Sequence, residues 1–154
     1  MNNGPNIIGN PLRIAVGLLI FSYVIGEFIV PKYHLIYALK LMGILGLISS
    51  TFIFISGFNM FKSYDENPLP ASTTDRIIKT GIFAYTRNPI YLAIVMFLLS
   101  MFLVFENVMY FLSAVGLAIW LHNYVIKLEE NSLLNKFSDE YGQYMKAVKR
   151  WIFF

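Results

Sequence analysis

Long apolar runs dominate the sequence, and they constrain its fold more than any other feature. Four of them cover about residues 11–30, 36–61, 89–105 and 108–126. A helix needs about 20 apolar residues to cross the hydrocarbon core of a bilayer, and only the third run is shorter. None of the runs shows the alternation of apolar and polar residues that a membrane β-barrel needs. The sequence therefore predicts a single, all-α, polytopic membrane domain with four transmembrane helices.

The composition narrows the function classes. Hydrophobic residues make up 57% of the chain and charged residues 14%, whereas soluble domains have about 25% charged residues. The chain has no cysteine, which excludes disulfides, thiolate metal sites and cysteine nucleophiles. Its two histidines lie far apart, so we expect no metal site. The net charge of +3 suits anionic lipid headgroups better than nucleic acid.

Two long polar segments interrupt the apolar pattern, at residues 62–88 and 127–154. The first holds a proline pair at 67–70 that breaks the helix, followed by capping hydroxyl residues at 72–74. A loop this long in a small protein is more often functional than a spacer. The second has apolar residues at helical spacing, which predicts an amphipathic C-terminal helix with a restart at Ser138-Asp139.

The start of the chain and the second run carry smaller signals. Residues 1–10 are polar and predict an interfacial lead-in, and residues 31–34 predict a short turn. In the second run, Gly46 and Ser50 have the spacing that lets two helices approach closely. This small-residue face packs against the first span or against a second copy in a homodimer, or it leaves room for a ligand.

The basic residues predict the orientation. Lys32 and Lys40 fall on one side of the membrane, and all the other lysines and arginines fall on the opposite side. The positive-inside rule then places both termini and the two polar segments in the cytoplasm.

The third run begins with an arginine, an asparagine and a proline. Pro89 suits the first position of a helix, and Asn88 is placed to cap it. The free N–H groups and the positive end of the helix dipole favour a carboxylate or phosphate there. Arg87 adds a permanent positive charge. The predicted topology brings Glu129 and Glu130 to the same side, so a polar cofactor with a carboxylate and an amine would find complementary partners.

These segments resemble a known family. Residues 80–91 and 129–144, on either side of an apolar hairpin, resemble the isoprenylcysteine carboxyl methyltransferases and their phospholipid methyltransferase relatives. The resemblance covers about residues 80–150. It implies an integral membrane enzyme that uses S-adenosylmethionine and releases S-adenosylhomocysteine.

The resemblance also implies roles for individual residues. It implies that the cofactor is bound by Gly81, Ile82, Tyr85, Arg87, Asn88, Pro89, Tyr91, Glu130 and Tyr141. Glu129 and Glu130 fall on the family's catalytic pair, and His122 is a further candidate base. The chain departs from the family pattern in three places: Asn88 replaces a common histidine, Ser138 a glycine and Lys149 a proline.

The sequence thus predicts a methyltransferase that acts on a lipophilic acceptor, either an isoprenylcysteine-like carboxylate or a lipid. The expected partners are this acceptor and membrane lipids, and no nucleic acid. One alternative is a small four-helix transporter, although Glu27 and Lys40 lie toward the outer ends of their spans rather than at mid-membrane. Another is a non-catalytic membrane scaffold that uses the glycine-rich second span.

Overall fold

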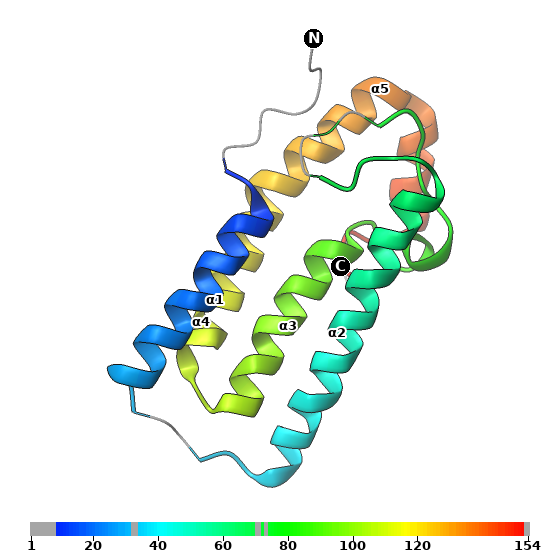
Figure 1. Cartoon of the computed structure of the whole chain (residues 1–154). Coiled ribbons are helices and arrows are strands. Elements are labelled where there is room, and N and C mark those ends of the chain that lie inside the picture. The colour runs from blue at the N-terminus through cyan, green and yellow to red at the C-terminus, as the bar shows by residue number, and fades with distance from the viewer. Residues whose placement is uncertain (1–8, 32–33, 70–71, 73, 153–154) are drawn as a thin grey trace.

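The chain folds as a bundle of helices (Figure 1). The computed structural model describes residues 9–31, 34–69, 72 and 74–152. Helices make up 76% of the structure, and these residues contain no strand, so the all-α prediction is confirmed. Parts of the predicted lead-in, turn and capping cluster lie outside the described residues, namely 1–8, Lys32, Tyr33, Pro70, Ala71 and Thr73.

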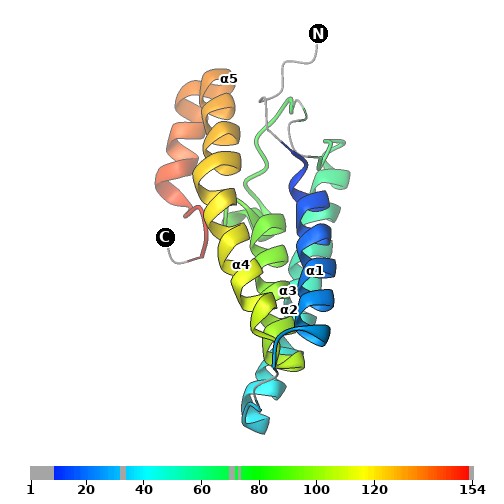
Figure 2. The same ribbon diagram turned by 90° about the vertical axis from the view of Figure 1, so that its left-hand side faces the viewer.

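Four helices run alternately up and down the bundle (Figures 1 and 2): α1 (Pro11–Phe28), α2 (Tyr37–Ser63), α3 (Pro89–Phe105) and α4 (Val108–Trp120). Among the described residues, α1, α2 and the helix that begins at Val108 are long and apolar enough to cross a membrane. Helix α3 is equally apolar but has only 17 residues. These helices support an integral membrane protein.

The α3–α4 hairpin has clear sequence signals at both ends. Helix α3 begins at Pro89, as predicted, and Glu106 ends it in a left-handed conformation with φ of 58°. The Asn107 side chain then caps α4 by accepting a hydrogen bond from the Met109 N–H. Glu106 also accepts a hydrogen bond from the Leu35 N–H at 2.6 Å, which ties the hairpin to the start of α2.

The helix that contains the fourth predicted span continues beyond residue 126. Helix α4 passes through a π-helical turn, η2 (Leu121–Val125), directly into α5 (Ile126–Ala147). No glycine or proline lies between residues 117 and 141, so nothing stops the helix where its composition turns polar. The break comes at Ser138, whose φ of 43° kinks α5 and confirms the predicted restart. The charged residues of α5 distinguish it from the apolar helices of the bundle.

Small residues let the helices approach closely. Helix α2 packs along α3, and a Cβ atom at Gly46 would lie 2.3 Å from the Ser100 Oγ. The small-residue face of α2 therefore packs against α3 rather than against the first span, which was one of the alternatives that the sequence left open. Helix α1 packs on α4 instead, where the Ser22 and Ser113 hydroxyls lie 2.7 Å apart.

The two polar segments lie at the same end of the bundle. The connection between α2 and α3, green in Figure 1, runs beside α5, orange in the same view. This connection includes a short 3₁₀ turn, η1 (Gly81–Ala84). Figure 2 shows that α5 folds back after its kink, which returns the chain toward the start of α3.

Candidate functional site

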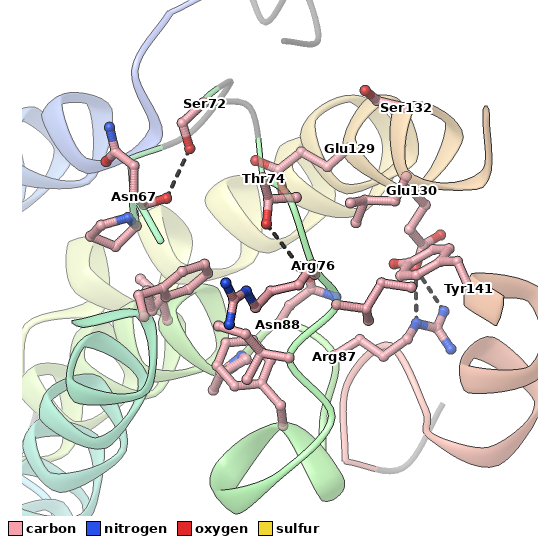
Figure 3. Close-up of a pocket in the computed structure, with 18 of the residues that line it drawn as sticks. Asn67, Ser72, Thr74, Arg76, Arg87, Asn88, Glu129, Glu130, Ser132 and Tyr141 are labelled. Atoms are coloured by element: carbon pink, nitrogen blue, oxygen red, sulfur yellow. Dashed lines mark hydrogen bonds and ion pairs between the residues drawn. The ribbon is translucent and has the colours of Figure 1, made fainter. Parts of the chain in front are cut away.

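A cavity of about 620 Å³ lies at this polar end. Its walls come from the α2–α3 connection, the first turn of α3, the α5 helix and the ends of α1 and α2 (Figure 3). Several predicted site residues line it together, namely Arg87, Asn88, Pro89, Tyr91, Glu129, Glu130 and Tyr141. A volume in this range suits a small organic ligand.

Arg87 connects the start of α3 to α5. Its Nη2 lies 2.6 Å from the Glu130 Oε1, and its Nε donates to the same oxygen at 3.1 Å. Its Nη1 donates to the main-chain carbonyls of Met145 and Val148. The hydrogen bonds of the guanidinium are therefore made within the protein. They hold the second half of α5 against the Arg-Asn-Pro corner.

Glu130 is a buried carboxylate held by two arginines. It is 4% exposed, and Arg150, which follows α5, bonds both of its oxygens. Burial raises the pKa of Glu130, but the hydrogen bonds from Arg150 and Arg87 outweigh burial, so the pKa lies below its ordinary value. Glu130 is thus ionised and closes one wall of the cavity.

His122 lies behind this wall, and not among the residues that line the cavity. The Trp151 Nε1–H donates to its Nδ1 at 3.1 Å, and the Arg150 Nη1 lies 3.2 Å from its Nε2. The π-helical turn at the start of α5 positions the imidazole for these contacts. The arrangement joins His122 to the segment that follows α5.

Glu129 has a different environment from Glu130. Its Oε1 accepts a hydrogen bond from the Tyr91 hydroxyl at 2.8 Å, and Figure 3 shows its side chain extending over the cavity toward Thr74. Burial raises the pKa of Glu129 to about 7, with the Tyr91 bond opposing the shift and the Glu130 carboxylate adding to it. A carboxyl group with this pKa can bind a cation or exchange a proton near neutral pH.

The sequence predicted that the Asn88 side chain caps α3, but the structure shows no such hydrogen bond. The Asn88 Nδ2 donates instead to the Arg150 carbonyl at 3.1 Å, and the first turn of α3 has no side-chain cap. The residue adopts a conformation outside the helical region because a proline follows it. Since Pro89 to Tyr91 line the cavity, the N-terminus of α3 remains available to an anionic group there.

The η1 turn contributes Phe83 to the cavity lining and no other residue. Gly81 has φ of 59°, a conformation that favours glycine, and neither it nor Ile82 lines the cavity. Tyr85 is 74% exposed and also lies outside the lining. Phe83 does line it, and its carbonyl accepts a hydrogen bond from the Tyr144 hydroxyl at 2.6 Å.

A family model for phospholipid methyltransferases matches residues 38–140, which is more than half of the chain. The chain belongs to the phospholipid methyltransferase family. A comparison with curated proteins gives no match. Membership of this family supports a membrane methyltransferase. The matched region includes Arg87 and both glutamates, but it leaves out α1 and Arg150.

This phospholipid methyltransferase family member has further cavity residues that sequence reasoning missed. They come from the α2–α3 connection and from α5, namely Asn67, Ser72, Thr74, Arg76, Ser132 and Lys136. The polar composition of residues 62–88 was the one signal that pointed to the four in the connection. Lys136 fastens the connection across α5, because its Nζ donates to the Thr74 carbonyl and pairs with Asp75 at 2.9 Å.

Proposed function

We propose that the protein transfers a methyl group from S-adenosylmethionine to a lipophilic acceptor at the polar end of the bundle. The observation that carries the proposal is the pairing of Arg87 with Glu130, because it joins two sequence-distant family motifs in the wall of one cavity. Isoprenylcysteine-like carboxylates and lipids remain the acceptor classes under this proposal.

The cavity residues fit such a cofactor. The uncapped first turn of α3 offers main-chain N–H groups to its carboxylate. Glu129 is the carboxyl group that faces the cavity without an arginine partner among the described residues, so it suits the ammonium group. Arg87 and Glu130 form an ion pair with each other. We therefore assign them to positioning the cavity wall rather than to direct contact with the cofactor. Phe83, Tyr141 and Tyr144 provide aromatic surface for the adenine.

The protein itself binds the cofactor and the acceptor, orients them and excludes water from them. Bound S-adenosylmethionine supplies an activated methyl group on its sulfonium. The two arginines on Glu130 hold the α5 wall at a fixed distance from α3. A carboxylate acceptor needs no base, because it is already ionised near neutral pH. The connection between α2 and α3 lies over the cavity, where Lys136 fastens it.

Calorimetry with S-adenosylhomocysteine on the purified protein in neutral detergent tests the proposal. We expect wild-type binding and a weakening of about tenfold or more for Glu129→Gln, because a charge-assisted bond to the ammonium is lost. Lys62→Gln, a charge change on an exposed residue outside the cavity, is the matched control. Absence of binding by the wild type would overturn the proposal.

A further inference from the structure

Arg76 is a positively charged residue that lines the cavity. Its side chain is 61% exposed, and its Nε lies 3.7 Å from the Glu66 Oε1. Its two terminal nitrogens donate to no acceptor within the described part of the chain. The cavity's other cations all have close partners: Arg87 bonds Glu130, and Lys136 bonds Thr74 and Asp75.

Arg76 and Arg87 serve opposite ends of the cavity. Figure 3 shows their side chains leaving the same segment in opposite directions, with Arg87 reaching Glu130 and Arg76 extending toward the side where Asn67 lies. The cavity lining away from the glutamates includes Leu12 of α1 and Phe61 of α2. This end combines one positive charge with apolar surface, whereas Glu129, the ammonium partner of the cofactor proposed above, lies on α5 beside Glu130.

A second hollow, of about 290 Å³, continues from this end between α1, α2 and α3. Leu12 lines both the cavity and this groove. The remaining lining is apolar except for Ser50 and Thr51, whose hydroxyls donate to the Leu47 carbonyl. Val16 of α1 lines this groove and is 59% exposed, so the groove opens on the apolar outer surface of the helices.

We propose that the methyl acceptor is an anionic amphiphile whose phosphate or carboxylate group is bound by Arg76 and whose hydrocarbon chain lies in the α1–α2–α3 groove. This inference rests on the proposed function, since it assigns the acceptor side of the same site. A guanidinium presents two parallel N–H donors that match either acid group. An apolar groove that opens to the bilayer admits a chain without exposing it to water. Arg76 is thus the residue that selects the acceptor's charge.

The test compares three amphiphiles with one chain length. Dodecyl phosphate, dodecanoate and dodecanol are titrated at pH 8 into the protein in neutral detergent with saturating S-adenosylhomocysteine. Partition into micelles is the same for every variant, so the comparison between variants reports on the protein. We expect the wild type to prefer the anionic amphiphiles over dodecanol by about tenfold or more. The phosphate and carboxylate arms show which of the two acid groups the site prefers.

The variants decide whether Arg76 causes this preference. Arg76→Gln is expected to abolish it, Arg76→Lys to keep part of it, and Lys62→Gln to leave it unchanged. Binding of S-adenosylhomocysteine, measured separately, is expected to stay within about twofold in Arg76→Gln. The inference is overturned if the wild type shows no charge preference, if the preference survives Arg76→Gln, or if that variant loses cofactor binding by a similar factor. Failure of wild-type cofactor binding would instead reject the proposed function.

Discussion

Arg87 and Glu130 are 43 residues apart in the sequence, and their Nη2 and Oε1 atoms lie 2.6 Å apart. Both side chains are almost fully buried, at 7% and 5% exposure. A buried ion pair of this kind tolerates the loss of one partner poorly, because removal of Glu130 leaves Arg87 without a counter-charge and removal of Arg87 leaves Glu130 with Arg150 alone. The pair therefore holds the α3 corner and α5 together, and its removal should be measurable in stability.

A double-mutant cycle tests this coupling. Glu130→Ala should lower the free energy of unfolding by about 3 kcal/mol, since it leaves Arg87 without a counter-charge. Arg87→Ala should lower it by less, about 2 kcal/mol, since Arg150 still pairs with Glu130. The double variant should lose less than the sum, by about 1–3 kcal/mol. Unfolding in mixed micelles, followed by tryptophan fluorescence, measures all four proteins. Strictly additive losses would show that the two residues do not support each other.

Glu129 makes cofactor binding depend on pH. Its pKa is raised to about 7, so the free protein holds a proton there through mildly acidic pH. Binding an ammonium group requires the ionised form, and affinity for S-adenosylhomocysteine should rise with pH up to about 7 and then level off. Below pH 7 the change in this affinity approaches about tenfold per pH unit. Calorimetry across pH 5.5 to about 8.5 measures it.

The Glu129→Gln variant provides the matching control, because it cannot titrate at this position. Its weaker binding should be independent of pH over the same range. The raised pKa has a stability consequence of the opposite sign: the folded state binds a proton more tightly than the unfolded chain, so this group's contribution to stability falls as pH rises from about 4.5 to 7. A parallel pH dependence in the variant would assign the effect to another group.

Two glycines of α1 give a matched pair for the packing of this helix. A Cβ atom at Gly26 would lie 1.6 Å from the Asn107 Nδ2, whereas one at Gly17 would meet nothing within 4 Å. Gly26→Ala should therefore lower the free energy of unfolding by about 1–3 kcal/mol, because Asn107 must leave its hydrogen bond to the Ser22 carbonyl. Gly17→Ala should cause no loss. Equal effects would contradict the close contact between α1 and Asn107.

Ser138 occupies a backbone conformation that suits glycine. Its φ of 43° and ψ of −116° interrupt α5, and side chains other than glycine are strained there. Ser138→Gly should raise the free energy of unfolding by about 1 kcal/mol. Gln143→Gly, at an exposed helical position of the same segment, should lower it by about 0.5 kcal/mol. A loss of stability in Ser138→Gly would show that the kink is not strained.

Local sequence signals gave the helices but not all of their ends. The bounds of α3 were predictable, since Pro89 starts the helix and the residues after Phe105 turn polar at once. The passage from α4 into α5 was not, because a change to polar residues alters which medium a helix lies in but does not end it. The kink was predictable, because Ser138 and Asp139 follow the apolar Phe137 and are residue types that favour helix breaks and new helix starts.

The candidate site was partly predictable for a similar reason. Arg87 and the two glutamates were expected on one side because the hairpin between their motifs returns the chain. The contacts of Arg150 and Trp151 depend on how far α5 folds back after its kink, and no local pattern encodes that angle. Arg76 lacked any signal beyond the polarity of its loop, because its position depends on how residues 64–88 cross the cavity.

One uninterrupted helix from Val108 to the kink carries both the buried seam against α1 and α3 and the two glutamates of the cavity wall. When this helix tilts as a rigid body within the bilayer, its polar end, which carries the two glutamates, rotates with it. Hydrophobic mismatch changes such tilts. The thickness of the surrounding lipid layer would therefore adjust the width of the cavity, and the enzyme's turnover would respond to the membrane as a mechanical environment.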